Sequence, residues 1–184
     1  MVSTDDEEIA KVAIRYGAKV PFIRNDNTAN DFATLSEVIG EVIERYRNKK
    51  NIKFDNICSI MATYPFISDE LLKDSFQKMI SLNGSSLIAV SEYNPPIQRA
   101  FRIKDNLLSM VYPELFNTRT QDLDLHYQDA GSFFWVKSDS FFKYKKGITD
   151  KTIPYILSNE VVQDIDNLSD WRLAELKYKL IHDD

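Results

Sequence analysis

The sequence is poor in the residues that build several common kinds of site. It contains one cysteine, two histidines and five glycines in 184 residues. A lone cysteine, Cys58, cannot form a disulfide within the chain, and without a Cys/His cluster we expect no zinc site. The Gly-x-x-x-x-Gly-Lys-Ser/Thr and Gly-x-Gly-x-x-Gly phosphate-binding patterns are missing, as is the Gly-x-Ser-x-Gly turn of serine hydrolases.

Charge and hydropathy exclude further classes. The formal net charge is −5 and no basic stripe occurs, so we expect no nucleic-acid surface. There is no run of about eighteen apolar residues and no signal-type N-terminus, so we expect neither a membrane span nor export, and a reducing cytoplasm fits. With 43% hydrophobic residues the chain can bury a core, and we expect one domain over residues 1–184.

Alternating strand and helix patterns predict an open, mostly parallel, Rossmann-like α/β sheet. The apolar runs at 57–62 and 86–91 are typical of strands buried on both faces. Residues 1–4 look like the end of a strand, and residues 19–22 form another strand candidate. Helices are expected after the Thr4–Glu7 capping box, from Thr34 or Ser36, and from Ser68. The first half therefore reads β-α-β-α-β-α-β.

The second half adds a hairpin and returns to the sheet. Strands at 101–104 and 107–111 flank an Asp105-Asn106 turn, and further strands are expected at 132–136 and 153–157. Ligands of open α/β sheets bind outside the carboxyl ends of the strands. We therefore expect the loops Arg24–Asp31, Ala62–Phe66 and Glu92–Gln98 to share one rim with Asp164 and Asp166.

The acidic pair Asp164 and Asp166 follows two valines that look like the end of a strand. Residues i and i+2 of a strand point the same way, so both carboxylates would lie on one face. Such hard oxygen donors suit Mg²⁺. The alternative is that two aspartates simply end a strand and begin a turn, and taken alone the pattern favours this alternative. A following helix, capped by Asn167 or Ser169, would turn its apolar residues inward: Trp171, Ala174 and Tyr178.

The loop at 117–136 carries a second group of polar side chains. A cation, an amide and two carboxylates lie beside Gly131: Arg119, Gln121, Asp122 and Asp129. This set suits an acidic, hydroxyl-rich small molecule. An ordinary solvated surface loop would have the same composition, and the residues alone leave both interpretations open.

Six segments occur in an order that resembles the acylneuraminate cytidylyltransferase family, the CMP-sugar synthetases of nine-carbon acidic sugars. They are VSTDDEEIA, the loop after PFIR, ATYPF, PPIQRA, NTRTQDLDLHYQDAGSFFW and DIDNLSDWRLAEL. The resemblance implies a sheet of nucleotidyltransferase type. Met61, Tyr64 and Gln98 depart from the pattern of sialate-type members. The branch that uses pseudaminic acid is therefore the better match, with an N-acetylneuraminate enzyme as the alternative.

The resemblance also implies roles for individual residues. Asp164 and Asp166 match the catalytic pair that binds Mg²⁺. Arg24, Asp31 and Thr34 match the nucleotide-binding region. The positions that match the sugar-binding residues are Gln98, Arg119, Gln121, Asp129 and Phe134. The hairpin insertion at 97–117 resembles the segment through which members form homodimers. The implied partners are CTP and a nonulosonic acid, joined by attack of the anomeric hydroxyl on the α-phosphorus with release of pyrophosphate.

One departure concerns the start of the chain. Family members begin with a strand and a glycine-rich, basic loop around the triphosphate, and this sequence has no such loop. We therefore expect that one β-loop-α unit of roughly 30 residues is missing and that the chain alone forms no CMP-sugar. Two other functions remain open: a glycosyltransferase with an Asp-x-Asp metal site, and a non-catalytic remnant that serves as a binding module.

Overall fold

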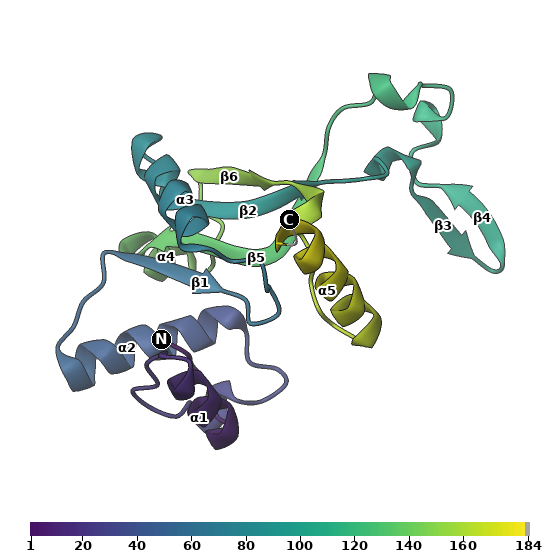
Figure 1. Ribbon diagram of the computed structural model, residues 1–184. Coiled ribbons are helices and arrows are strands. Elements are labelled where there is room, and N and C mark those ends of the chain that lie inside the picture. The colour runs from purple at the N-terminus through teal and green to yellow at the C-terminus, as the bar shows by residue number, and fades with distance from the viewer. Residues whose placement is uncertain (183–184) are drawn as a thin grey trace.

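A four-stranded mixed sheet lies at the centre of the fold (Figure 1). The computed structural model describes residues 1–182. The strand order is β1-β5-β2-β6, comprising β1 (Asn56–Ile60), β5 (Tyr127–Lys137), β2 (Ser86–Glu92) and β6 (Thr152–Leu157). Three of these strands run in one direction. The fourth, β5, runs antiparallel between β1 and β2, while β2 and β6 are parallel neighbours. The predicted α/β class is confirmed, with β5 as the reversed strand.

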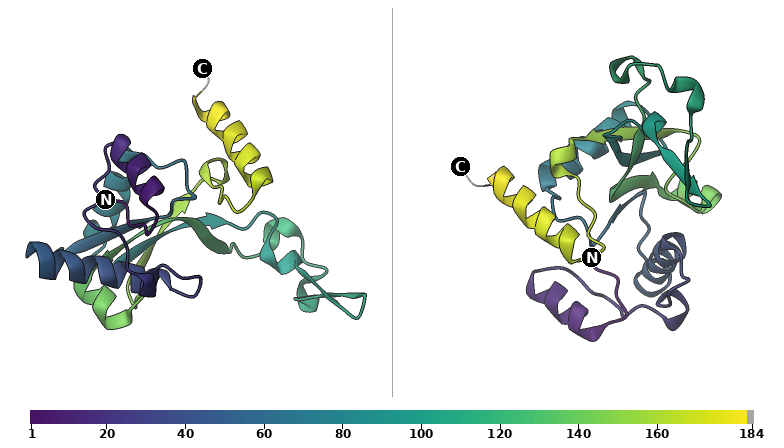
Figure 2. Two further views of the ribbon diagram at one scale, coloured as in Figure 1. Left: turned by 90° about the horizontal axis from the view of Figure 1, so that it is seen from below. Right: turned by 90° about the vertical axis from the view of Figure 1, so that its right-hand side faces the viewer.

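Helices cover both faces of this sheet (Figures 1 and 2). On one face, Met79 of α3 (Asp69–Ser81) packs with Leu87 and Phe133. On the other face lie α2 (Leu35–Lys50) and α4 (Ser138–Tyr144), which contribute Ile39 and Phe141. Because side chains alternate along a strand, neighbouring residues of β5 enter both cores.

Capping side chains fix the starts of the helices. In α1 (Glu7–Arg15) the cap is Asp6, whose carboxylate accepts from two backbone amides, so the predicted Thr4 cap is wrong. Thr34 caps α2 in a capping box with Glu37, and Ser68 caps α3, as predicted. The α5 helix (Leu168–His182) begins where Asn167 Oδ1 accepts from the amides of Ser169 and Asp170. These caps pair amides that helix ends leave free.

Two expected strands near the N-terminus do not form. Residues 1–4 and 19–22 carry no strand assignment in the described structure, and Phe22 lies in a bend. Two backbone hydrogen bonds join this region, from Val2 N to Lys19 O and from Arg24 N to Thr4 O. Two bonds hold the segments side by side but do not make a continuous strand ladder. The loop after residue 23 therefore does not follow a strand.

The predicted hairpin is confirmed as β3 (Phe101–Lys104) and β4 (Leu107–Met110), which extend away from the sheet (Figure 1). Asp105 and Asn106 form its two-residue turn with positive φ at both positions, the geometry that suits hairpin turns. Its apolar side chains are largely solvent-exposed, including Phe101, Ile103, Leu107 and Leu108.

The α5 helix packs loosely. Ala174 is buried as expected, but Trp171 and Tyr178 are about half exposed, so their predicted inward orientation is wrong. The Tyr178 ring lies 6.5 Å from the Phe66 ring and 4.2 Å from the His182 ring, measured between centroids. None of the helices in residues 1–182 has the length and apolar content needed to cross a membrane.

Candidate active site

An irregularity in β5 forms one wall of the candidate site. Ile88 of β2 pairs with Phe134, but Val90 pairs with Asp129, so β5 uses more residues than β2 over the same distance. Within the bulge Gly131 has a φ of +61°, a conformation that favours glycine. The Asp129 carboxylate accepts a hydrogen bond from Gly131 N at 2.9 Å. Such bulges redirect side chains near binding sites.

The bulge opens onto a groove of about 540 Å³. One side is residues 128–131 of β5, and the other is residues 162–164, which follow β6. A Cβ added to Gly131 would lie 3.0 Å from Oδ2 of Asp164, so these two segments touch. Since β2 and β6 both end here, the groove lies at the carboxyl ends of parallel strands, where ligands of such sheets bind.

The acidic pair does not follow a strand. β6 ends at Leu157, and a 3₁₀ turn spans Asn159–Val161. Asp164 lines the groove, and its Oδ1 accepts from Ile165 N while Oδ2 faces Gly131. Asp166 is outside the groove lining, and its backbone amide donates to Asp170. The prediction that a strand aligns the two carboxylates on one face is therefore wrong. Both aspartates still lie on one short segment.

Lys177 fixes the position of this segment. Its Nζ donates to Val162 O at 2.6 Å and to Asn159 O at 3.1 Å, linking α5 to the chain before Asp164. Burial lowers the pKa of the Lys177 ammonium group below its ordinary value. The bonds lie on the approach to the groove, so Lys177 helps to place Asp164.

The donor set of the acidic segment fits Mg²⁺. Two carboxylates are available, and Mg²⁺ commonly uses one or two of them with water and phosphate as its other ligands. Within residues 1–182 no group of three or more His, Cys, Asp or Glu side chains could hold a metal. An all-protein cage is therefore not present in that range, whereas a substrate-assisted Mg²⁺ site matches the donors.

Four of the five predicted sugar-binding residues lie in three separate places. Asp129 lines the groove. Gln98 is buried at the base of the hairpin arm (residues 97–117), where Nε2 donates to Asp124 O and His126 Nδ1, and its Oε1 lacks a partner. Arg119 and Gln121 are exposed beyond the hairpin, and the Arg119 guanidinium pairs with Asp122 at 2.7 Å. The structure does not bring these three places into one pocket.

Phe134 lies in the core. It is 8% exposed and packs in the cluster that includes Ile39 and Phe141. A Cβ on Gly147 would lie 2.8 Å from its ring, so the chain closes tightly over it. The structure thus places Phe134 under α2 and α4 and outside the groove lining, away from the predicted contact with sugar.

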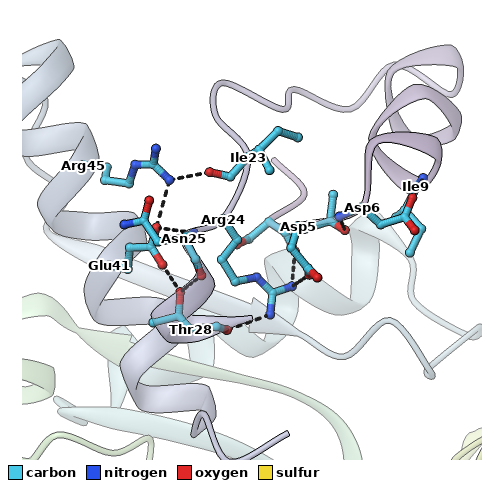
Figure 3. A network of polar contacts seen from close by, with 11 residues as sticks. Asp5, Asp6, Ile9, Ile23, Arg24, Asn25, Thr28, Glu41 and Arg45 are labelled. Carbon is cyan, nitrogen blue, oxygen red and sulfur yellow. Dashed lines mark hydrogen bonds and ion pairs between the residues drawn. The ribbon is translucent and has the colours of Figure 1, made fainter. Parts of the chain in front are cut away.

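The predicted nucleotide residues lie in the N-terminal part of the chain, and Figure 3 shows the polar contacts of Arg24. The Arg24 guanidinium donates to Ser3 O at 2.9 Å and to Thr28 O at 3.3 Å, and lies 3.8 Å from Asp5. Asp31 is exposed in the following turn, and Thr34 caps α2. None of the three lines the groove, so the expected common rim is not formed by side chains in the described structure.

Sequence reasoning missed two residues of α2, Glu41 and Arg45, which bind the loop that carries Arg24. Their spacing of four along a helix is the signal that could have found them, because side chains at i and i+4 meet. A surface ion pair would have the same spacing, so the sequence alone does not identify their backbone partners.

Cys58 is a packing residue. It lies against the core cluster of α3, and burial raises its thiol pKa to about 12. The thiolate is the nucleophilic form, so this residue is protonated and unreactive near neutral pH. The interpretation of Cys58 as a small core residue is consistent with this environment.

Sequence comparison gives close relatives over the whole chain. Residues 1–109 match the cytidylyltransferase family model. The chain is 34% identical to a pseudaminic acid cytidylyltransferase of Campylobacter jejuni, covering 100% of this chain and 79% of the relative. It is 29% identical to a CMP-N,N'-diacetyllegionaminic acid synthase of Legionella pneumophila, covering 95% of this chain and 75% of the relative.

Structure comparison supports the fold. A CMP:2-keto-3-deoxy-manno-octonic acid synthetase solved with CTP superposes with a TM-score of 0.63 at 11% identity, covering 98% of this chain and 79% of the other. The shared fold agrees with a family match over more than half of the sequence and with 34% identity over its full length. The chain belongs to the cytidylyltransferase family.

Proposed function

We propose that the protein is a CMP-sugar synthetase that transfers CMP from CTP to a nine-carbon acidic sugar, preferably pseudaminic acid, and releases pyrophosphate. The observation that carries this proposal is the contact between Gly131 and Asp164, which joins two segments of the family resemblance at the carboxyl ends of β2 and β6. The relatives named above support the same reaction class.

Asp164 and Asp166 are proposed to hold Mg²⁺ at the phosphates. A metal held there would offset the phosphate charge that develops during attack on the α-phosphorus. The chain's own contribution is to fix the carboxylates: Gly131 leaves room for Asp164, and Lys177 holds the preceding backbone. An acidic segment held in one place loses less conformational freedom when substrate binds.

The sugar is proposed to bind along the β5 side of the groove. Asp129 uses Oδ1 for Gly131 N, so Oδ2 remains to accept from a sugar hydroxyl. Arg119 would pair with the sugar carboxylate, because a planar guanidinium matches a carboxylate with two parallel hydrogen bonds. Gln98, in the hairpin arm, and Gln121, in the turn beyond it, would contact the same substrate. Phe134 would stabilise β5 by packing in the core.

CTP is proposed to lie against the N-terminal region, with Arg24, Asp31 and Thr34 beside the nucleotide. The guanidinium of Arg24 is already oriented by two backbone carbonyls, which reduces the side-chain entropy lost on binding. The polar loop around it offers further hydrogen-bonding groups to the nucleotide.

A homodimer formed through the hairpin arm is also proposed. The hairpin extends from the sheet and exposes Ile103 by 74% and Leu107 by 73%. Neighbouring exposed apolar side chains on an extended element are typical of protein interfaces. We place this enzyme in the cytoplasm, where the lone thiol of Cys58 would stay reduced.

The function is tested with purified protein, CTP, Mg²⁺ and one sugar at a time. If the proposed function holds for this chain, pyrophosphate and the CMP-sugar form with pseudaminic acid, contrary to the expectation drawn from the missing phosphate loop, and N-acetylneuraminic acid is the poorer substrate in competition. Tight binding of CTP and sugar without product would instead support a binding module. Consumption of a preformed nucleotide-sugar, with no reaction of CTP, would support a glycosyltransferase.

A further inference from the structure

A nearly buried ion pair lies on the inner side of α2. The Arg45 guanidinium is 2.8 Å from the Glu41 carboxylate, and the two side chains are 16% and 10% exposed. An exposed pair of the same spacing, Lys73 with Asp69, is 74% and 71% exposed. Moving two charges away from water costs free energy that their attraction only partly repays. The α2 pair therefore needs further partners.

Those partners are all in the loop that carries Arg24 (Figure 3). Glu41 Oε1 accepts from Asn25 N at 3.1 Å, and Glu41 Oε2 accepts from the hydroxyl of Thr28. Arg45 Nη1 donates to Ile23 O at 2.5 Å. Residues 23 and 25 flank Arg24, so α2 holds the backbone on both sides of that residue.

The Glu41–Arg45 pair also restricts the conformations of the loop that carries Arg24. The Arg45 guanidinium lies 4.3 Å from the centre of the Phe22 ring, so its contacts extend to the residue before Ile23. Arg24 Nη1 in turn donates to the backbone carbonyl of Thr28, the residue whose hydroxyl binds Glu41. Backbone and side chain of Arg24 are thus tied to one arrangement of the loop.

We propose that Glu41 and Arg45 are positioning residues for CTP: they hold Arg24 in its nucleotide-binding orientation without touching the nucleotide. This inference rests on the proposed function, in which Arg24 lies beside CTP. Without Glu41, Asn25 N loses its acceptor, the Thr28 hydroxyl keeps only its bond to Asn25 O, and Arg45 is left as a nearly buried charge without an acidic partner. The loop then samples other conformations, and CTP selects the competent one from a smaller population.

The test compares Glu41→Ala, Glu41→Gln and Asp69→Ala in the full chain. Calorimetry with Mg²⁺ measures the Kd of CTP and of the sugar, and thermal unfolding reports the fold. We expect Glu41→Ala to raise the Kd of CTP by about tenfold, the effect of losing a hydrogen bond to a charged group. The sugar Kd should stay within about twofold by the same scale. Glu41→Gln keeps one acceptor oxygen and should restore part of the CTP affinity.

Asp69→Ala removes the exposed pair on α3 and should change neither Kd. Amide exchange gives a second readout, because Asn25 N should exchange faster in Glu41→Gln than in wild type. If Glu41→Ala does not fold, Glu41→Gln and Arg45→Lys provide the same comparison. A folded Glu41 variant with unchanged CTP affinity, or with equal losses for CTP and sugar, would overturn the inference alone. A wild-type chain that binds no CTP would contradict the proposed function as well.

Discussion

The Asp164 carboxylate occupies the space that a side chain at Gly131 would need. A Cβ at residue 131 would lie 3.0 Å from Oδ2 and 3.2 Å from Cγ of Asp164. Gly131 and Asp164 are far apart in sequence, but the fold places them next to each other. Glycine at 131 meets two demands at once, since the backbone there also has a positive φ.

We therefore predict that Gly131→Ala impairs the site more than the fold. The left-handed backbone should cost about 1–2 kcal/mol of stability, and the added methyl should displace the Asp164 carboxylate. Mg²⁺ titration and thermal unfolding measure the two effects. The control is Gly40→Ala in α2, where a Cβ meets nothing within 4 Å and should stabilise the helix by about 0.5–1 kcal/mol. Unchanged Mg²⁺ affinity in Gly131→Ala would argue against a metal role for Asp164.

The second prediction concerns the two carboxylates individually. Asp164→Asn and Asp166→Asn should each weaken Mg²⁺ binding and lower turnover by at least roughly 100-fold, because an amide cannot replace the negative charge at the metal. The larger loss is expected for Asp164, which lines the groove. Steady-state rates over a range of Mg²⁺ concentrations provide the measurement. The control is Glu175→Gln, which changes an exposed residue of α5. Wild-type rates in both Asp variants would show that the two aspartates only form a turn and do not bind a catalytic metal.

The sequence predicted those helices, strands and turns that are determined by residues close to one another in the chain. The α2 capping box, the buried strand β2 and the Asp105-Asn106 hairpin turn all depend on residues close in sequence. β1 also forms a strand, but it lies half-buried at the edge of the sheet with Ile60 44% exposed, so its predicted burial on both faces is wrong. The place of β5 between β1 and β2 was not predicted, because this strand pairing joins residues 35 or more positions apart in sequence. The N-terminal strands failed for a related reason, since a strand needs neighbours as well as an extended sequence.

For the site, too, the sequence indicated individual residues but not the contacts between distant segments. Asp129 and Asp164 were identified by resemblance, but their meeting across Gly131 depends on the bulge in β5, which apolar periodicity does not encode. Phe134 was assigned to the sugar from its position in a motif, whereas the alternation of β5 places it in the core beneath α2. A motif thus indicates a region of the chain without fixing the direction of each side chain.

The third prediction addresses the hairpin arm. Ile103 and Leu108 are paired across β3 and β4 and are 74% and 63% exposed. If they form a dimer interface, Ile103→Asp and Leu108→Asp should shift the protein to monomer at micromolar concentration, because a charge in an apolar interface is poorly solvated. Light scattering after size exclusion measures the mass. Ile148→Asp changes an exposed apolar residue outside the hairpin and should leave the mass unchanged. A monomeric wild-type protein would contradict the dimer proposal.

The last prediction follows from the Cys58 thiol. Burial raises its pKa from 9.0 to about 12, so at pH 8 the folded protein should hold only about 1 in 10,000 of its thiols as thiolate, against about 1 in 10 in the unfolded chain. Alkylation at pH 8 should accordingly be about 1,000-fold slower in the native protein than in denaturant. A group with a raised folded pKa gives stability that is complete below its unfolded pKa and is lost as pH rises toward the folded pKa. Thermal stability should therefore fall above about pH 9, and Cys58→Ala should reduce that fall. Rapid alkylation of the folded protein, as measured by mass spectrometry over time, would show that the thiol is not buried in this way.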